Sequence, residues 1–201
     1  DVFTRLITDR AQEFDRIEPG YEGPLYAEVS PRSFSILVRE GSRLNQLRLR
    51  RGSPPSSDTE LRRLQQEQGI VAGDADISDG IALTVDLKGA GANELVGYRA
   101  KRHAGLIDVD KSGAHDVGDF WEPIRARNDA SMVLDPNEFY ILASREAVSI
   151  PPEYAAEMVP YNPLVGEFRV HYAGFFDPGF GYSGAGGAGS RAVLEVRSHE
   201  V

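Results

Sequence analysis

The sequence predicts an all-β protein, a sandwich or barrel with little helix. Short runs of alternating apolar and polar residues recur along the chain, and turns rich in proline and glycine separate them. A turn that leads into a strand also occurs twice, in similar form, near the two ends of the sequence. Only residues 57–69 have the capping residues and apolar spacing of a helix, so helix contributes little to the predicted fold.

The predicted elements follow one another in a simple order. The first strands are expected at 25–29, 34–38 and 44–49. Residues 51–57 have the composition of a linker, and the helix at 57–69 begins with a capping serine or aspartate and ends at a glycine. Later strands are expected at 81–87, 133–134, 139–143, 168–172 and 192–196. The glycine-rich run at 181–189 follows a turn, which favours a hairpin tip over a dinucleotide-binding loop.

Composition and charge exclude several classes of function. The chain has 201 residues, 41% of them hydrophobic and 26% charged, so it can bury an ordinary globular core. Its 31 acidic and 22 basic residues give a net charge of -9, which argues against broad binding to nucleic acid or to an anionic membrane surface. No apolar run approaches the roughly 20 residues of a membrane span. Because the chain begins with Asp-Val-Phe, we interpret it as a fragment or a processed protein.

Cysteine is absent, which excludes disulfides, iron–sulfur clusters, cysteine nucleophiles and thiolate zinc sites. A reducing cytoplasm fits this composition, and a chain without cysteine is equally stable outside it. The histidines lie far apart and form no metal-binding pair, so each is interpreted as a surface or core residue: His103, His115, His171 and His199. Phe120 and Trp121 are interpreted as a packed anchor, and residues 101–103 as a solvated basic turn.

The internal repeat is the most informative pattern. Residues 16–29 contain an acid-Pro-Gly-aromatic turn that leads into a strand, and residues 175–196 contain the same turn, a glycine-rich insertion and a similar strand. Each strand carries one carboxylate among apolar neighbours, Glu28 in the first copy and Glu195 in the second. Because a carboxylate on a buried strand face must be solvated or used, both are candidate functional groups. A passive surface glutamate is the alternative.

The second copy resembles the dCTP deaminase signature, in which an acid-Pro-Gly-Trp turn precedes a strand ending in Val-Leu-Glu. The corresponding residues here are Asp177-Pro-Gly-Phe180 and Ala192-Val-Leu-Glu-Val196, and the first copy has Arg16-Ile-Glu-Pro-Gly-Tyr21. Residues 41–47 resemble a Gly-x-x-Ile-x-Gln-Leu strand of the dCTP deaminase and dUTPase superfamily. Segments 58–71, 83–87, 134–141 and 148–154 also resemble elements of the family. The resemblance covers nearly the whole chain and is nearest to the double-length bacterial enzymes.

This resemblance implies a β-clip, dUTPase-like fold, a distorted barrel or jelly roll with a short helix and two related units in tandem. Residues 1–55 would be the C-terminal part of the first unit, and residues 57–201 a second unit that lacks its C-terminal strand and tail. The resemblance also implies a homo-oligomer with a trimer-like assembly. Its ligands would be dCTP and dUTP, with no nucleic acid or membrane partner, and its location the cytoplasm.

The implied reaction is the hydrolytic deamination of dCTP to dUTP and ammonia. Zinc deaminases need cysteine and histidine ligands that a chain without cysteine cannot supply, so a carboxylate must activate the water. The resemblance gives this role to Glu195 or Glu28. Val193, Leu194, Val196 and Asp177 are expected to raise the pKa of Glu195. Mg²⁺ would accompany the triphosphate. The residues implied in nucleotide binding are Asp177, Ala173, Val193 and Leu194 in the second copy and Arg16, Glu18, Tyr26, Ala27 and Gln46 in the first.

The family's Arg-Ser-Ser-x-x-Arg loop, which contacts phosphate and water, leaves the choice between the two copies open. In the second copy the matching stretch is Val159-Pro-Tyr-Asn-Pro-Leu164, which contains neither serine nor arginine. In the first copy the loop would precede Asp1. Two alternatives to dCTP deamination also stand at this point. One is a dUTP pyrophosphatase on the same fold, and the other is a catalytically silent structural repeat.

Overall fold

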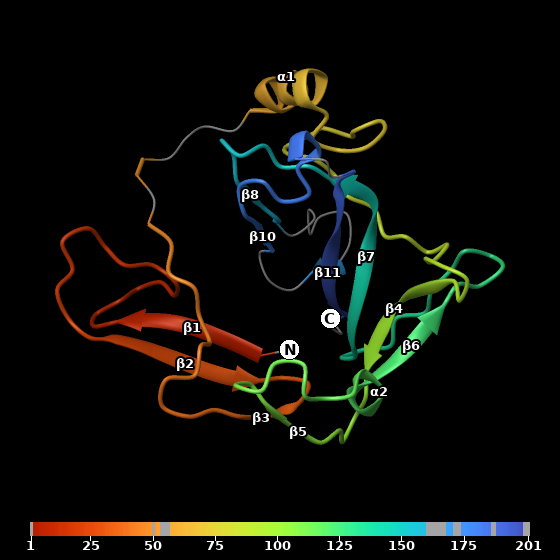
Figure 1. Cartoon of the computed structure of the whole chain (residues 1–201). Helices are drawn as coiled ribbons and strands as arrows, with labels where there is room; N and C mark the ends of the chain where they lie inside the picture. The colour runs from red at the N-terminus through yellow and green to blue at the C-terminus, as the bar shows by residue number, and fades with distance from the viewer. Residues whose placement is uncertain are drawn as a thin grey trace. The chain divides into compact units, whose positions relative to one another are not determined.

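A computed structural model of the chain describes residues 2–49, 51–52, 57–159, 168–170, 174–185 and 188–198. The contacts within the chain divide it into two compact units. The first contains residues 1–50 and 100–121, and the second contains residues 51–99 and 122–201. Strands outnumber helices in both units, which confirms the predicted mainly-β class (Figure 1).

The first unit is built from two pairs of strands. Its elements are β1 (Val2–Thr8), β2 (Leu25–Pro31), β3 (Ser35–Leu37), β5 (Leu106–Asp108) and the short helix α2 (Val117–Phe120). β1 and β2 form an antiparallel pair, and β3 and β5 form a parallel pair. The predicted anchor is confirmed, because the ring of Phe34 packs edge-on against both Phe120 and Trp121, with centroids 5.4 and 5.2 Å apart.

The second unit has a five-stranded sheet in the order β6-β4-β7-β11-β9 (Figure 1). Its strands are β4 (Leu95–Ala100), β6 (Trp121–Arg125), β7 (Phe139–Val148), β9 (Phe168–Val170) and β11 (Ser190–Ser198). A separate pair is formed by β8 (Ala156–Glu157) and β10 (Phe175–Phe176). The remaining elements are α1 (Asp58–Gln68) and the 3₁₀ turn Ser183–Ala185.

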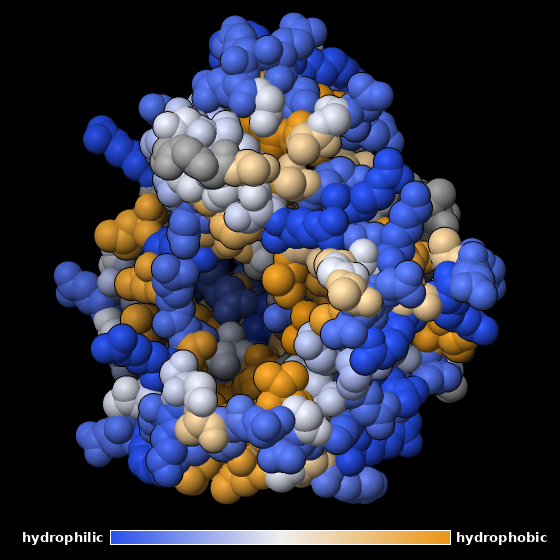
Figure 2. All heavy atoms as spheres, turned by 45° about the vertical axis from the view of Figure 1, so that its right-hand side comes forward, coloured by the Kyte–Doolittle hydropathy of each residue, from blue (hydrophilic) through white to orange (hydrophobic). Residues whose placement is uncertain are grey.

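The one long helix forms where the sequence predicts it. The side chain of Ser57 caps the N-terminus of α1 by accepting the N–H of Glu60, and Gly69 ends the helix with φ 61° and donates its N–H to the carbonyl of Gln65. Leu64 provides the buried contact of the helix. Figure 2 shows that the outward side of α1, at the top of the view, is hydrophilic, as expected for an amphipathic surface helix.

The core of the second unit lies on one face of β7 and β11. Tyr140 and Leu142 on β7 face Leu194 and Val196 on β11, and all four side chains are at most 4% exposed. This alternation of buried and outward residues confirms the strands predicted at 139–143 and 192–196, and both are longer than predicted. Partly buried apolar residues complete the core: Leu83, Val85, Leu87, Ile124, Ala126, Met132, Leu134, Met158 and Phe176.

Three of the predicted strands are wrong. Residues 44–49 are not in a strand, and Leu47 and Leu49 are 63% and 93% exposed. Residues 81–87 make only isolated bridges, although Leu83, Val85 and Leu87 pack against the core. Residues 133–134 also lie outside any strand. Apolar alternation therefore identified contacts with the core in 81–87, but it did not identify whether a neighbouring strand would complete a ladder.

The glycine-rich run is not a hairpin tip. It joins β10 to β11, which belong to different sheets, since β10 pairs with β8 and β11 with β7 and β9. Gly181, at φ 60°, leaves no room for a Cβ between its own backbone and the amide nitrogen of Ser190, which would lie 2.6 Å away. The described part of the run therefore belongs to a connection between two sheets, and it is closely packed at Gly181.

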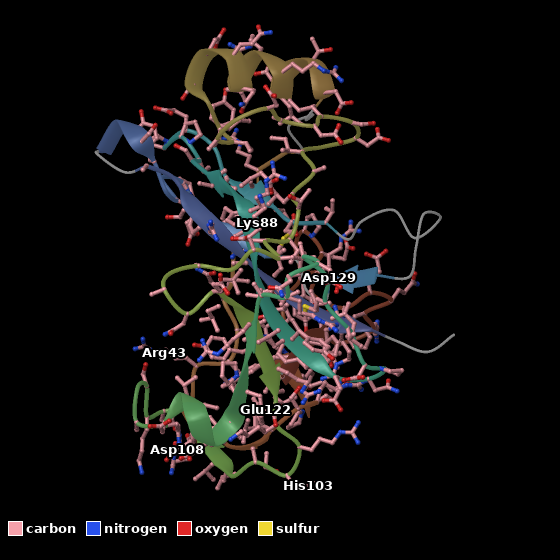
Figure 3. The ribbon with its side chains drawn as sticks, turned by 90° about the vertical axis from the view of Figure 1, so that its right-hand side faces the viewer. Arg43, Lys88, His103, Asp108, Glu122 and Asp129 are labelled. Carbon is pink, nitrogen blue, oxygen red and sulfur yellow. The ribbon has the colours of Figure 1, made fainter. Side chains whose placement is uncertain are left out.

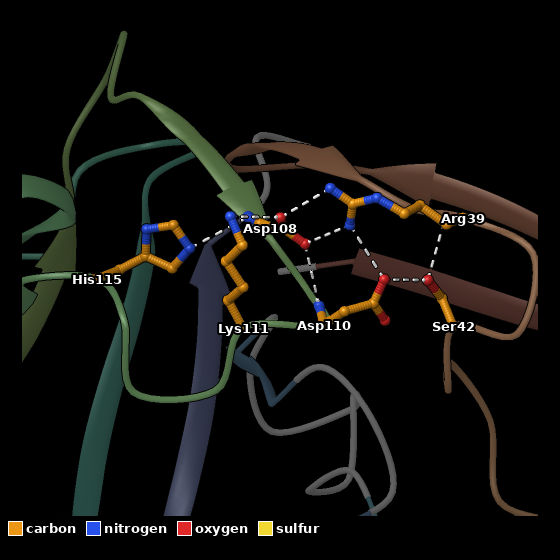
Figure 4. Close-up of polar contacts among 6 residues, drawn as sticks. All are labelled: Arg39, Ser42, Asp108, Asp110, Lys111 and His115. Atoms are coloured by element: carbon orange, nitrogen blue, oxygen red, sulfur yellow. Dashed lines mark hydrogen bonds and ion pairs between the residues drawn. The ribbon is translucent and has the colours of Figure 1, made fainter.

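A polar cluster fastens residues 100–121 to the first 50 residues in the first unit (Figure 4). The guanidinium of Arg39 binds both carboxylate oxygens of Asp108 at 2.7 and 2.9 Å, and one oxygen of Asp110 at 3.1 Å. Ser42 donates its hydroxyl to Asp110, and His115 accepts the N–H of Asp108 at Nε2. Because the side chain of Asp108 is only 10% exposed, this pair is the best shielded contact of the cluster.

We expect this cluster to make the first unit sensitive to acid. Hydrogen bonds from Arg39 hold the pKa of Asp108 well below its ordinary value of about 3.9. A carboxyl whose pKa is lower in the folded state than in the unfolded state stabilises the folded state. This contribution is complete at pH values above the unfolded pKa, and it is lost as the pH falls through the folded pKa. In thermal unfolding at pH 7, the midpoint of Asp108→Asn should therefore lie below that of wild type. The difference between the two midpoints should shrink between about pH 4 and pH 2.

The control is Asp74→Asn, because Asp74 is exposed and no ion pair holds it in the described part of the chain. Its midpoint should follow wild type at every pH. A gap between Asp108→Asn and wild type that stays constant from pH 7 to pH 2 would contradict the assignment of the Arg39 pair as the source of acid sensitivity.

Candidate active site

Glu195 lies on the face of β11 that points away from the core of the second unit. Its neighbours Leu194 and Val196 point into the core, whereas Val193, on the same side as Glu195, is 59% exposed. Across the ladder, Glu195 is paired with Ile141 of β7. The Glu195 side chain is partly buried, and this burial raises its pKa above the ordinary glutamate value.

The raised pKa was expected, but its expected causes need correction. Leu194 and Val196 cannot desolvate the carboxylate, because they lie on the opposite face of the strand. Burial alone raises the pKa of Glu195, and the exposed Asp177 is not a source of this rise. The result is a carboxylate at a sheet face that can hold or release a proton closer to neutral pH than an exposed glutamate can.

The two copies of the repeat have the same local geometry. The turn at 177–180 is closed by a hydrogen bond from Phe180 N to Asp177 O at 3.0 Å, and the turn at 18–21 by one from Tyr21 N to Glu18 O at 3.1 Å. The glycines at the third positions have φ of 86° and 80°. Proline followed by a glycine with positive φ is the pattern of a type II turn. Each turn is followed by a strand, β11 or β2, as the repeat predicts.

The similarity extends in part to the strands before each turn. β1 comes before the first turn and pairs antiparallel with β2, and β9 comes before the second turn and pairs antiparallel with β11. In the second copy β10, which pairs with β8, lies between β9 and the turn, whereas residues 9–24 of the first copy contain no strand. In the first pair, Glu28 lies opposite Arg5. The two copies therefore share a strand, a turn and a returning strand that carries the carboxylate, and the second copy has the additional strand β10 before its turn.

The first-copy residues lie in exposed positions. Tyr26 and Ala27 are exposed on β2, as is Glu28, so this hairpin buries neither face of β2 in the described structure. Arg16 is paired with Glu18 at 3.0 Å, so the structure brings these two predicted residues together. Gln46 is exposed outside any strand and accepts a hydrogen bond from Arg48. In the second copy, Ala173 lies outside the described residues.

Sequence reasoning missed a set of polar residues near β11. Asp86 is only 7% exposed and binds the guanidinium of Arg191 at 2.6 Å. Ser144 is fully buried and accepts the N–H of Ala192. The sequence contains part of the signal, because Asp86 belongs to the segment 83–87 that resembles an element of the family.

Other charged groups of the second unit are placed away from this strand. Glu122 on β6, labelled in Figure 3, binds Arg99 on β4 at 2.5 Å. Arg99 also contacts Asp135 at 3.1 Å, and the three side chains line a cavity of about 270 Å³. In the first unit, residues 102–103 form an exposed turn, as predicted, with His103 labelled in Figure 3. Lys101 differs from the prediction, because it is half-buried and its ammonium donates a hydrogen bond to the carbonyl of Gly118. Within the described ranges, no group of three or more acidic, histidine or cysteine side chains is arranged to hold a metal ion.

Comparison with known proteins gives the family of this chain. The family model of the 2'-deoxycytidine 5'-triphosphate deaminase C-terminal domain matches residues 57–201, and the model of the N-terminal domain matches residues 1–53. The chain belongs to the dCTP deaminase family. The resemblance inferred from the turn and strand motifs of this deaminase-family chain is thereby confirmed.

A solved structure is similar to this dCTP deaminase family member over its full length. It is the crystal structure of 2'-deoxycytidine 5'-triphosphate deaminase from Agrobacterium tumefaciens, with a TM-score of 0.93 and 62% sequence identity. The similarity covers 100% of this chain and 61% of that chain, so the sequence spans about three fifths of the length of this relative. A search among curated proteins found no match. None of the helices in the described segments has the length and apolar character needed to cross a bilayer.

Proposed function

We propose that the protein containing this chain hydrolyses dCTP to dUTP and ammonia, with Glu195 as the base that activates water. The single observation that supports this choice is the partly buried carboxylate of Glu195, whose pKa burial raises, in the strand that follows the family turn. The family match supports the substrate, and the crystallised relative carries the name of a dCTP deaminase.

In the proposed reaction, Glu195 removes a proton from water while the water oxygen bonds to C4 of cytosine and the C4=N3 double bond opens, leaving its electron pair on N3. The proton then passes from the carboxyl to the exocyclic amine, the electron pair on N3 re-forms the C4=N3 bond as the bond from C4 to the amine breaks, and ammonia leaves. The 4-hydroxy product becomes uracil when its hydroxyl proton moves to N3. The carboxylate is regenerated, so atoms and charges balance over the cycle. Such a group works best when its pKa approaches the working pH, and partial burial moves the pKa of Glu195 in this direction.

We assign this role to Glu195 rather than to Glu28 because the two carboxylates differ in surroundings. Glu28 is exposed on β2 and lies opposite Arg5, whereas Glu195 is partly buried on β11, an inner strand of a five-stranded sheet. Asp177, Val193 and Leu194 are proposed to contact base and sugar through the turn and the backbone of β11. Ala173, Arg16, Glu18, Tyr26, Ala27 and Gln46 remain proposed nucleotide contacts.

The fold is proposed to be a β-clip of the dUTPase type with two related units. The matching turns and the matching strand pairs β1–β2 and β9–β11 support this proposal. In this scheme residues 1–55 end one unit and residues 57–201 form most of the next. Mg²⁺ is proposed to enter with the substrate, because triphosphate oxygens are the hard ligands that it prefers. A nucleotide substrate and a chain without cysteine support a cytoplasmic location.

The test is to incubate the intact protein with Mg²⁺ and either dCTP or, in a separate reaction, dUTP, and to measure ammonia, dUTP and dUMP. From dCTP, ammonia and dUTP are the products to compare, and from dUTP, dUMP. Release of ammonia with dUTP in equal amounts is expected. Formation of dUMP from dUTP without ammonia from dCTP would indicate a pyrophosphatase instead. No turnover of either nucleotide would indicate a silent structural repeat.

The intact protein is expected to be a stable homo-oligomer. Exposed apolar side chains on the first unit support this expectation, since Leu25 and Tyr26 on β2 are each 50% exposed and Leu106 on β5 is 53% exposed. Light scattering coupled to size exclusion should give a mass that is a multiple of the chain mass, with a trimer as the expected assembly. A monodisperse monomer that deaminates dCTP at full rate would contradict the prediction.

A further inference from the structure

The ladder between β7 and β11 contains an irregularity close to Glu195. On one side of it Arg191 pairs with Ala147, and on the other side Val193 pairs with Ala143. Only Ala192 separates the paired residues on β11, whereas residues 144–146 separate them on β7. β7 therefore has two more residues than β11 at this point, which is a β-bulge, and the bulge sets which residues of β7 lie opposite Glu195.

The hydroxyl of Ser144 replaces the ladder contact that the bulge removes. Ala192 donates its N–H to Ser144 Oγ at 2.8 Å, and Ser144 Oγ donates to the carbonyl of Glu146 at 2.6 Å. Ser144 and Ala192 are both 0% exposed. A buried N–H needs an acceptor, so the hydroxyl satisfies Ala192 only while the bulge keeps Ser144 opposite this residue.

The segment 83–87 forms hydrogen bonds with the residues of β7 at the bulge. Thr84 donates its N–H and its hydroxyl to the two carboxylate oxygens of Glu146, at 2.8 and 2.5 Å, and accepts the N–H of Arg145 at 2.8 Å. Asp86 donates its N–H to the carbonyl of Ala143 at 3.0 Å. Thus every residue from Ala143 to Glu146 makes a hydrogen bond to the segment 83–87 or, at Ser144, to Ala192 and the carbonyl of Glu146.

We propose that Ser144 is a positioning residue for Glu195, an inference that rests on the proposed function. If pairing continued through the bulge without its two extra residues, Glu195 would shift by two residues along β7, about 7 Å. This movement would keep the carboxylate on the same face and move it away from its place opposite Ile141. A displacement of about 1 Å can reduce the rate of an oriented reaction by about 100-fold, so the bulge must be held firmly.

The chain offers a matched control in Ser149. This serine is 6% exposed, and its Oγ accepts the N–H of Ser183 at 3.0 Å, so Ser149→Ala also removes a shielded acceptor of a backbone N–H. It lies beyond the end of β7 and makes no contact with the bulge in the described structure. Ser144→Ala and Ser149→Ala are therefore expected to lose similar thermal stability and to differ in catalysis.

The experiment measures kcat, KM and the pH profile of kcat for ammonia release from dCTP by the intact protein, well below each unfolding midpoint. Ser144→Ala should lower kcat by about tenfold and change KM by less than about twofold. It should also shift the acid limb of kcat, because burial sets the pKa of Glu195 and a displaced side chain has a different burial. Ser149→Ala should keep the wild-type kcat and acid limb. Equal kcat values for the two variants would overturn the proposal.

Two further measurements address the cases in which Ser144→Ala does not fold or the proposed function is wrong. Thr84 is exposed, so Thr84→Val should fold even if Ser144→Ala does not, and it should lower kcat in the same direction by a smaller factor. A crystal structure of Ser144→Ala separates this inference from the proposed function. If wild type does not deaminate dCTP, the proposed function fails. If Glu195 of Ser144→Ala stays opposite Ile141 within about 0.5 Å, the positioning role fails whatever the activity.

Discussion

Replacing Glu195 with glutamine should lower kcat for dCTP by about 100- to 10,000-fold, the range typical of a lost general base. Glutamine keeps the size of the side chain and its ability to form hydrogen bonds, but it has no oxygen that can take a proton from water. Nucleotide binding should change little. The measurement is steady-state ammonia release together with a direct titration of dCTP binding.

Glu28→Gln is the matched control for this substitution. Glu28 is the corresponding carboxylate of the first copy, and it is exposed on β2 rather than partly buried. We expect Glu28→Gln to retain most of the wild-type kcat. If Glu28→Gln abolishes turnover and Glu195→Gln does not, the first copy carries the working base. If neither substitution changes kcat, the carboxylate mechanism is wrong for this protein.

The pH dependence of kcat gives independent evidence on the same group. Because burial raises the pKa of Glu195, the base form is lost at a higher pH than for an ordinary glutamate, whose pKa is about 4.3. The acid limb of kcat in wild type should therefore lie above this value. It should be absent from the residual activity of Glu195→Gln.

Local sequence patterns predicted much of the fold and the position of the candidate base. Capping residues fixed both ends of α1, at Ser57 and Gly69, because a helix terminus is satisfied by groups a few residues away. The acid-Pro-Gly turns were predictable for the same reason. The strand carrying Glu195 followed from period-two alternation around Leu194.

What the sequence did not predict depends on pairing between distant segments. Residues 81–87 have the alternation of a strand, but the bulge in β7 takes up their hydrogen bonds at Thr84 and Asp86. In the sequence, Ser144 is an ordinary serine within an apolar run. Its role as acceptor of the Ala192 N–H depends on a residue 48 positions away, which only the folded structure places opposite it. Register and bulges are set by two strands together, so one strand's sequence cannot specify them.

The sheet beside Glu195 also depends on a glycine. Gly97 of β4 pairs with Leu142 of β7, one position from Ile141, which lies opposite Glu195. A Cβ at position 97 would press on the backbone carbonyl oxygen of Ile141 and lie 2.7 Å from Leu142 Cδ2. A carbonyl in a central strand cannot move aside as the end of a flexible side chain can, so β4 must separate from β7 to admit a methyl group.

Gly97→Ala should therefore destabilise the second unit by about 3 kcal/mol, the upper part of the range for inserting a methyl group into a packed core. For a chain of this size, this corresponds to a fall of about 6–12 °C in Tm. The control is Gly105→Ala, because the nearest atom to a Cβ at position 105 is Phe120 Cζ at 3.8 Å, an ordinary contact. The Tm of Gly105→Ala should stay within about 2 °C of that of wild type, since a surface substitution that creates no close contact changes stability little. Thermal unfolding of both variants decides the matter: equal midpoints would mean that β4 and β7 can part at this position without cost, and that Ile141 is not held by the close approach of Gly97.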